Sequence, residues 1–256
     1  MALPLYYAVI NSLKPLNELW LFPPRFYVQN PTFKNFSDLV ILMSNSWVPF
    51  SRYLFNTLLI TTVGTGGQII VASMAAFPLA KHRFPGKKLF FSIIVLSLMF
   101  NSTVTTVPTY LVMMTLGWVD TYWALIVPAI GSSLGLYLMK QFMEQIPDAI
   151  LEAALIDGAN KWDTFWRIVM PSVKSAWLTL IIFSVQTLWN MGATSFIYDE
   201  AKKTLPYALG QIISGGIARA GAGSAITVVL LVVPITIFIV TQSNIIETMA
   251  NSGIKE

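Results

Sequence analysis

The sequence predicts an all-α protein: a polytopic bundle of transmembrane helices that forms a single domain over residues 1–256. Three observations predict this class. Hydrophobic residues make up 55% of the chain and charged residues only 11%, where soluble domains carry about 25%. The mean hydropathy is +0.66. The charges also leave long uncharged runs between them. So few charges cannot cover a 28.4 kDa particle in water, but they suffice if lipid covers most of it.

The composition excludes several kinds of chemistry. The chain has no cysteine, which excludes disulfides, a thiol nucleophile and a cysteine metal site. Its single histidine, His82, cannot form a histidine metal cluster, so no metal site is expected. The net charge of +4 is explained better by cytoplasmic lysines and arginines than by a nucleic-acid partner.

The uncharged runs predict the spans. A bilayer core needs about 20 apolar helical residues, and five runs meet that length, at about 53–80, 89–113, 121–140, 175–196 and 222–246. Residues 1–13 are apolar but reach only about 20 Å as a helix, short of the core of about 30 Å. We interpret them as a partial first span, incomplete through truncation or a mis-assigned start. The proline-rich residues 14–50 are expected outside the membrane.

The orientation follows from the short loop after the first full span. Lys81, Arg83, Lys87 and Lys88 lie in this loop with no acidic residue among them. Such a loop stays cytoplasmic by the positive-inside rule. The alternation of the spans then places 141–174 and the tail 247–256 in the cytoplasm as well.

Catalysis is not expected of this chain. The glycine-rich stretch at 64–67 is not followed by the Lys-Ser or Lys-Thr pair of a phosphate-binding loop, so the chain should not hydrolyse nucleotide and is not an enzyme. The middles of the spans carry no Asp, Glu, Lys, Arg or His, which disfavours a proton-coupled carrier.

The cytoplasmic segment 141–174 carries most of the information. Pro147 and Asp148 suit a helix start, and Gly158 suits the left-handed residue after a helix end. Asn160 can cap a second short helix with Asp163 three residues on. We expect two short helices joined by a glycine corner, with Pro171 opening the next span. The apolar face of the first is too small to bury within the chain, so it should dock in a partner groove. The alternative is an ordinary helix at the membrane interface.

This segment resembles the EAA signature of ABC importer permeases. That signature runs E-A-A, three residues, G, nine residues, I-x-L-P. The chain follows it with Glu152-Ala153-Ala154, Gly158, Ile168 and Pro171, and departs from it at Met170, where leucine is usual. Other stretches are similar to carbohydrate-uptake permeases, the maltose-type smaller permease included: residues 4–7, 12–15, 22–24, 30–32, 35–36, 83–87 and the tail 252–256.

The resemblance implies a fold and partners. The fold would be that of a type I ABC importer permease, with six spans of which the first is incomplete here. The partners would be a second homologous permease, two cytoplasmic ATPase subunits and an extracellular sugar-binding protein, in a bacterial cytoplasmic membrane and surrounded by lipid. The chain itself would bind no cofactor, because ATP and magnesium are used by the partner subunits. Sugar import would proceed by alternating access.

The resemblance also implies the site residues. The ATPase-coupling set is Glu152, Ala153, Ala154, Asp157, Gly158, Ala159, Ile168 and Pro171. Tail residues expected to contact the ATPases are Ser252, Gly253, Ile254 and Lys255. Uncharged polar or aromatic groups within the spans are candidates for the sugar pathway, or alternatively for interhelical hydrogen bonds: Asn56, Gln68, Asn101, Gln186, Trp189 and Asn190. The alternative functions are import of a peptide, an amino acid or phosphate, and an ATPase-independent carrier or channel.

Overall fold

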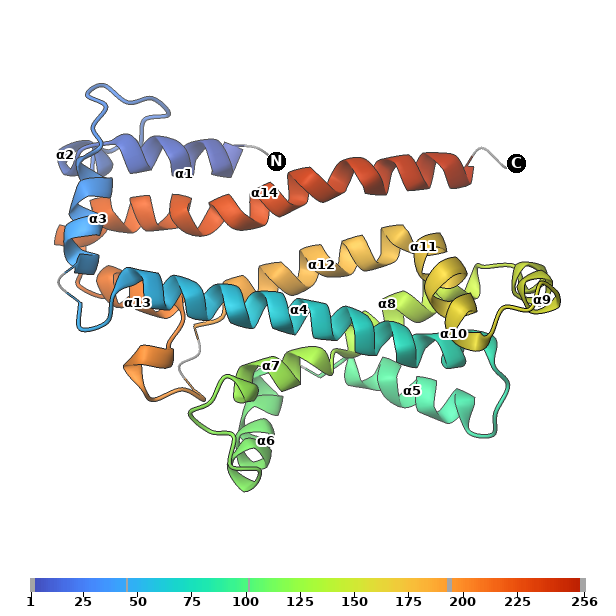
Figure 1. Cartoon of the computed structure of the whole chain (residues 1–256). Coiled ribbons are helices and arrows are strands. Elements are labelled where there is room, and N and C mark those ends of the chain that lie inside the picture. Colours follow the sequence, from blue (N-terminus) through green and yellow to red (C-terminus); the bar gives the residue numbers. More distant parts are fainter. Residues whose placement is uncertain (1–2, 45, 101, 193–194, 254–256) are drawn as a thin grey trace. The chain divides into compact units, whose positions relative to one another are not determined.

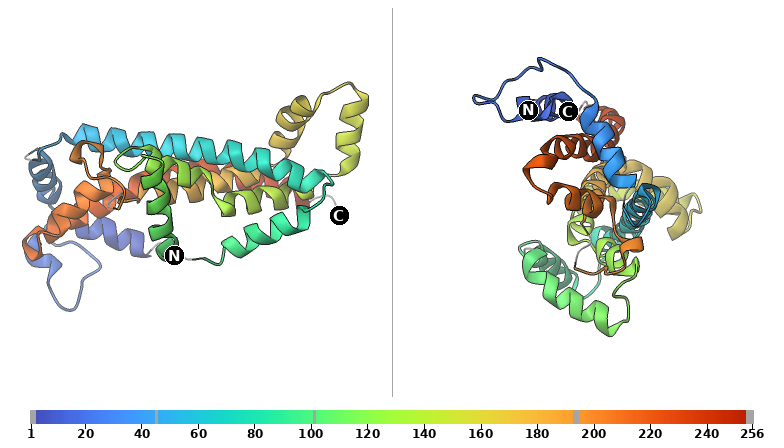
Figure 2. Two further views of the ribbon diagram at one scale, coloured as in Figure 1. Left: turned by 90° about the horizontal axis from the view of Figure 1, so that it is seen from below. Right: turned by 90° about the vertical axis from the view of Figure 1, so that its left-hand side faces the viewer.

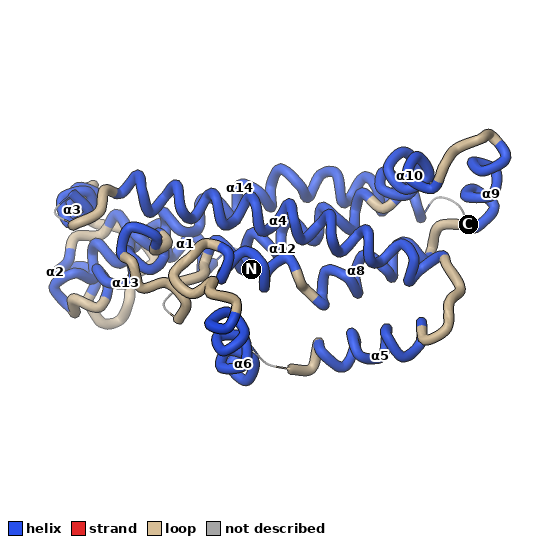
Figure 3. The backbone as a smooth tube through the Cα atoms, turned by 60° about the horizontal axis from the view of Figure 1, so that its bottom comes forward, coloured by secondary structure: helices blue, strands red, loops and turns tan. Residues whose placement is uncertain are grey.

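The computed structural model describes residues 3–44, 46–100, 102–192 and 195–253, and every regular element in these ranges is a helix (Figure 3). The prediction of an all-α fold is therefore confirmed. The first half contains α1 Leu3–Leu13, α2 Leu16–Leu19, α3 Lys34–Ser44, α4 Phe50–Lys81, α5 Lys87–Ser97, α6 Ser102–Thr115, α7 Trp123–Ile130 and α8 Ser133–Glu144. The second half contains α9 Asp148–Ile156, α10 Lys161–Asp163, η1 Thr164–Val169, α11 Met170–Ser172, α12 Lys174–Trp189, η2 Glu200–Lys202, α13 Leu205–Ile213, η3 Ile217–Arg219 and α14 Ala220–Gly253.

Three helical stretches among the described residues are long and apolar enough to cross a membrane: Phe50–Lys81, Trp123–Glu144 and Ile217–Gln242. Lys161–Ser172 together with Lys174–Trp189 forms a fourth candidate, bent by 75°. The long helices α4, α12 and α14 are labelled in Figure 1.

The chain divides into two compact units, Met1–Leu59 with Trp189–Thr236, and Ile60–Leu188 with Ile237–Glu256. In the first unit, buried ionic side chains hold the segment between α1 and α3. The Lys14 ammonium donates to the Arg25 carbonyl at 2.6 Å, and the Glu18 carboxylate accepts from the backbone N–H of Gln29 at 3.1 Å and of Asn30 at 3.0 Å. Buried charges of this kind persist only when they are hydrogen-bonded. The connecting segment is therefore held in one conformation by specific contacts.

The second unit has a continuous apolar core that contains the cytoplasmic ends of several predicted spans. Small residues of α4, Ala72 and Ala76, pack there against Met139 and Met143 of α8 and against Val169 of η1. A Cβ added at Gly135 of α8 would lie 3.1 Å from the Gln68 amide nitrogen and 3.2 Å from Leu180. The small residues thus let α4, α8 and α12 approach closely, as small residues do between membrane helices.

The span expected at 89–113 is not one continuous helix. The structure has α5 up to Ser97 and α6 from Ser102, with a turn at 98–100 between them and residue 101 outside the described part. Hydroxyl-bearing and β-branched residues crowd the sequence from 102 to 106. Hydroxyl side chains are favoured at helix starts, which fits a new helix that begins at Ser102.

The span expected at 121–140 also differs from the prediction. It is interrupted between Ile130 and Ser133, where the Ser132 hydroxyl caps α8 by accepting from the Gly135 N–H at 3.2 Å. It continues past Lys140 to Glu144. Lys140 does not end the helix because its ammonium lies 2.6 Å from the Glu144 carboxylate and 3.8 Å from the centre of the Phe91 ring.

The last two helices end at residues other than the predicted ends of the last two spans. The prediction placed residues 175–196 in one span, but α12 ends at Trp189. The prediction ended the last span at 246, but α14 continues to Gly253, so residues 247–253 are helical rather than an extended tail. Pro171 does not open the span either, because the long helix begins at Lys174, after the 75° bend.

Candidate coupling site

The segment that carries the EAA-like residues folds as the sequence predicts at its first helix. The helix α9 begins at Asp148, directly after Pro147, whose extended backbone (ψ 134°) cannot continue a helix backwards. The Asp148 carboxylate lies in the first turn, where the helix dipole favours negative charge. In Figure 2 the segment from α9 to α11 is yellow and lies at the end of α4.

The predicted glycine corner is present. Gly158 has φ +84°, in the left-handed region that glycine tolerates and other residues rarely adopt. Its N–H donates to the Leu155 carbonyl at 3.1 Å, and the Ala159 N–H donates to the Ala154 carbonyl at 2.9 Å. These two bonds form a Schellman motif, which satisfies carbonyls that the helix end would leave unpaired.

The second short helix is capped as expected but continues differently. The Asn160 side-chain oxygen accepts from the Asp163 N–H at 2.8 Å. After α10 the backbone passes into the π-helix η1 over Thr164–Val169, which the sequence did not predict. A single π-helical turn is rare and often lies at a functional site.

The π-helix anchors the segment to the second unit. Phe165 is 4% exposed and Val169 is fully buried in the core that includes Ala72 and Met139. The Phe165 ring lies 5.6 Å from the ring of Phe77 on α4, centre to centre. Burying a phenylalanine of this kind stabilises by about 1.5–3 kcal/mol. Phe165 and Val169 therefore pack η1 against the core that α4 and α8 share.

By contrast, α9 leaves most of its apolar side chains exposed, and Leu151 is half-buried against the core. Only Ala154 of this helix is buried. Ile150, Leu155 and Ile156 are 47%, 56% and 87% exposed. Leu155 and Ile156 lie at the end of a helix whose backbone is fixed at both ends. Their exposed side chains form an apolar surface suited to binding a partner protein.

The structure gives each predicted coupling residue a place. Glu152, Ala153, Asp157, Gly158 and Pro171 are exposed, Ala159 and Ile168 are half-buried, and Ala154 is buried. Ala154 therefore allows close approach to the chain's own interior rather than to a partner. The exposed residues Glu152, Ala153, Asp157 and Gly158 lie on or directly beside α9, whereas Pro171 lies on α11.

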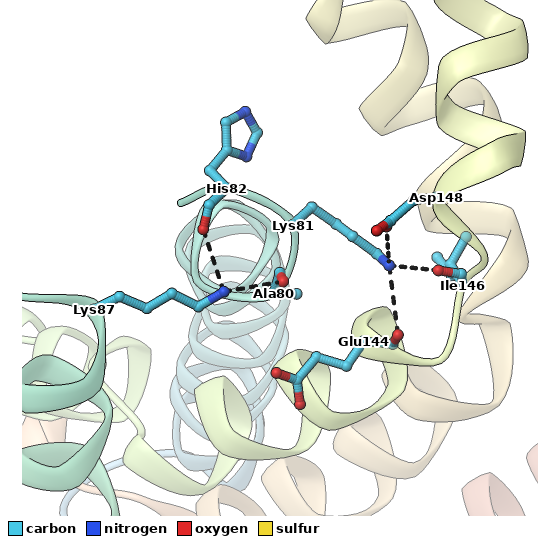
Figure 4. A network of polar contacts seen from close by, with 7 residues as sticks. All are labelled: Ala80, Lys81, His82, Lys87, Glu144, Ile146 and Asp148. Atoms are coloured by element: carbon cyan, nitrogen blue, oxygen red, sulfur yellow. Dashed lines mark hydrogen bonds and ion pairs between the residues drawn. The ribbon is translucent and has the colours of Figure 1, made fainter. Parts of the chain in front are cut away.

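Lys81 is a central residue of this site that the sequence reasoning used only for orientation. Its ammonium donates to the Glu144 carbonyl at 3.4 Å and to the Ile146 carbonyl, and it lies 2.8 Å from the Asp148 carboxylate (Figure 4). The hydrogen bond to this ammonium, with its charge, holds the pKa of the Asp148 carboxyl below its ordinary value. The Lys87 ammonium donates to the carbonyls of Ala80 and His82, both at 3.2 Å, which caps the end of α4.

The candidate pathway residues lie in both compact units and stay a prediction. Asn56 is buried and donates to the carbonyls of Ala201 and Lys203, both at 2.9 Å, and buried Trp189 donates to the Leu230 carbonyl at 3.0 Å. Gln68 is buried in the second unit. These bonds match the alternative interpretation, interhelical or loop-fixing hydrogen bonds. Gln186 and Asn190 are exposed, and Asn101 lies outside the described residues.

The tail residues remain a prediction. Ser252 and Gly253 lie in the last turn of α14, while Ile254 and Lys255 lie outside the described residues.

These features define a class of protein, a polytopic helical membrane subunit that displays an anchored helix between two apolar helices. The chain belongs to the family of binding-protein-dependent transport system inner membrane components, whose profile matches residues 68–248. This family places the chain in the membrane.

Curated relatives agree with this family. The chain is similar to Protein LplC of Bacillus subtilis (strain 168), 36% identical over 165 residues, 64% of this chain and 55% of the relative. It is 31% identical to the polygalacturonan/rhamnogalacturonan transport system permease protein YtcP of the same organism, over 68% of this chain and 66% of that protein. It is 28% identical to the sn-glycerol-3-phosphate transport system permease protein UgpE of Yersinia enterocolitica, over 97% of this chain and 90% of that protein. The chain thus spans 55% of the length of LplC and 66% of the length of YtcP.

Solved structures show the same fold. One is a chain of a bacterial ABC transporter involved in the import of the acidic polysaccharide alginate, with a TM-score of 0.77 and 22% identity over 94% of this chain and 90% of that chain. Another comes from a bacterial alginate ABC transporter in complex with an alginate pentasaccharide-bound periplasmic protein, with a TM-score of 0.61 and 17% identity over 80% of each chain.

Proposed function

We propose that this chain is a transmembrane permease subunit of an ATP-driven, binding-protein-dependent sugar importer that works by alternating access. The observation that carries the proposal is α9, which is fixed to the second unit at both ends and yet leaves Leu155 and Ile156 exposed. A carrier that works without an ATPase has no use for such a helix.

The exposed face of α9 is the surface we assign to an ATPase subunit. Leu155 and Ile156 would enter an apolar groove of that subunit, and Glu152 and Asp157 would make charge contacts at its rim. Closure of two ATPases on ATP and magnesium would then move α9. Phe165 and Val169 would pass the movement to α4 and α8, and two paired permeases would rock between states open to either side.

The solute class rests on the relatives. Printed names among them include transport of polygalacturonan and rhamnogalacturonan, which supports an oligosaccharide. The second candidate is a small phosphorylated polyol, because a glycerol-3-phosphate permease matches 97% of this chain. The solute would arrive on an extracellular binding protein, and this chain would hold no cofactor and catalyse no reaction.

The first prediction concerns nucleotide. The purified chain should show no ATP hydrolysis above a protein-free blank, because it lacks a phosphate-binding loop. A preparation that also contains a second permease and the ATPase subunits should hydrolyse ATP, and should respond to a binding protein loaded with oligogalacturonide or glycerol 3-phosphate. Saturable ATP turnover by the isolated chain would contradict the proposed permease function. Failure of the chain to retain an ATPase subunit when the two are purified together would contradict it as well.

A further inference from the structure

Lys81 joins the ends of three helices. It is the last residue of α4, its acceptor Glu144 is the last residue of α8, and Asp148 is the first residue of α9. The Lys81 side chain is only 8% exposed. Figure 4 shows its ammonium directed at all three acceptors.

The two carbonyls that accept from Lys81 lie where the helix itself supplies no hydrogen-bond donor. The last carbonyls of a helix have no partner within the helix, and a positive charge there also meets the favourable end of its dipole. Glu144 and Ile146 offer such carbonyls at the end of α8 and in the connection to α9. One ammonium satisfies both and still reaches Asp148. The connection between α8 and α9 is therefore fixed to α4.

The ion pair of Lys81 with Asp148 and its hydrogen bonds to the two carbonyls differ in strength. Asp148 is 76% exposed, so its ion pair with Lys81 is screened by water and contributes little. Arg83 and Lys87 also lie close enough to affect Asp148, which makes the carboxylate less dependent on Lys81 alone. The bond from the Lys81 ammonium to the Ile146 carbonyl is partly buried, whereas the bond to the Glu144 carbonyl is exposed and, at 3.4 Å, long. Because hydrogen bonds of charged groups are the stronger kind, the bond to Ile146 is the main attachment.

The other attachment of α9 lies at its far end. The Schellman turn at Gly158 leads through α10 into η1, which is held by Phe165 in the core. Between these two attachments α9 buries Ala154 and packs the half-buried Leu151 against the core. Without Lys81 the helix would keep its far attachment, and its first turn would be free to swing about Gly158.

We infer that Lys81 is a positioning residue for energy coupling: it holds the start of α9 to α4, so that force on α9 moves the spans instead of tilting the helix. This inference rests on the proposed function, because it concerns the helix assigned to the ATPase. It assigns to a loop lysine a role beyond fixing membrane orientation.

The test compares four variants of the full chain, each in the assembled complex. Lys81→Met removes the ammonium and keeps the length of the stem, whereas Lys81→Arg restores charged donors. Asp148→Asn removes only the ion pair, and Lys88→Met is the matched control at an exposed lysine of the same loop. A nitroxide attached at Ala149→Cys, an exposed position in the first turn of α9, reports the mobility of the end that Lys81 holds, and a nitroxide at Ser172→Cys reports the segment beyond η1. The chain has no cysteine of its own, so each label is unique.

In Lys81→Met we expect the nitroxide at 149 to become mobile while the one at 172 is unchanged. ATP hydrolysis without binding protein should rise roughly tenfold, the size of one lost charged hydrogen bond, because the ATPases would close without having to move the spans. Lys81→Arg should restore both readouts. Asp148→Asn should change them much less than Lys81→Met, and Lys88→Met should change neither.

Two results would overturn the inference. One is a Lys81→Met complex with the nitroxide spectrum and basal hydrolysis of Lys88→Met. The other is an equal change at 149 and 172, which would show general loosening instead of release of the start of α9. If the wild-type chain retains no ATPase, the proposed function fails, and the two nitroxide positions in the permease still decide whether Lys81 holds α9. If Lys81→Met does not accumulate, Asp148→Asn and Lys81→Arg are compared by the same two readouts. Full mobility of the nitroxide on α9 in Asp148→Asn would then contradict the role of the carbonyl bonds.

Discussion

Gly158→Val should abolish transport, to below about one tenth of the wild-type rate, while the protein still inserts and accumulates. The position has φ +84°, and a β-branched residue there is strained by at least about 1–3 kcal/mol. No atom lies within 4 Å of the place where a Cβ would go, so the cost comes from the backbone alone. The strain is relieved by opening the turn, which breaks the bonds of Gly158 and Ala159 to the end of α9.

The measurement is solute uptake by the complex in proteoliposomes, set against the amount of inserted chain. Gly158→Asn is the matched control, because asparagine tolerates the left-handed region far better than valine. It should keep most of the activity. Normal uptake by Gly158→Val would show that the corner does not set the direction of α9.

Ile156→Asp should prevent the ATPase from binding. Ile156 is 87% exposed in the chain, and the proposal places it in an apolar groove of the partner. An ionised carboxylate in such a groove loses its hydration without gaining a partner. We expect affinity to fall by at least about thirtyfold, the effect of losing one central contact of an interface.

Retention of the ATPase on the purified permease measures this effect. Ile41→Asp makes the same change at an isoleucine of α3 that is 53% exposed and lies in the segment expected outside the membrane. It should leave retention unchanged. Equal loss in both variants would show a general effect of the charge, and full retention by Ile156→Asp would remove α9 from the interface.

Local signals in the sequence predicted the corner of this site well. Gly158, Asn160 and the start of α9 at Asp148 depend on neighbours within a few residues, so their spacing predicts them. The π-helix at Thr164–Val169 was missed because its backbone follows from the burial of Phe165 and Val169, which the sequence alone does not reveal.

Contacts between distant residues account for the other differences. Lys81 bonds to carbonyls 63 and 65 residues away, and carbonyls have no signature in a sequence. Lys140 ended a predicted span because a lone lysine is costly in lipid, but Glu144 and the ring of Phe91 compensate its charge. Asn56 was a candidate for the sugar pathway, yet it fixes the backbone at 201 and 203.

The most direct test of the account is the reactivity of a single cysteine at position 156. The chain has none of its own, so Ile156→Cys provides one thiol on the exposed face of α9, and Trp47→Cys, at a fully exposed position, provides the control. Both should react rapidly with a maleimide in the purified permease. With the ATPase bound, labelling at 156 should slow by at least about tenfold, as expected for a side chain at the buried centre of an interface, and labelling at 47 should not change. Equal labelling at 156 with and without a bound ATPase would contradict the account.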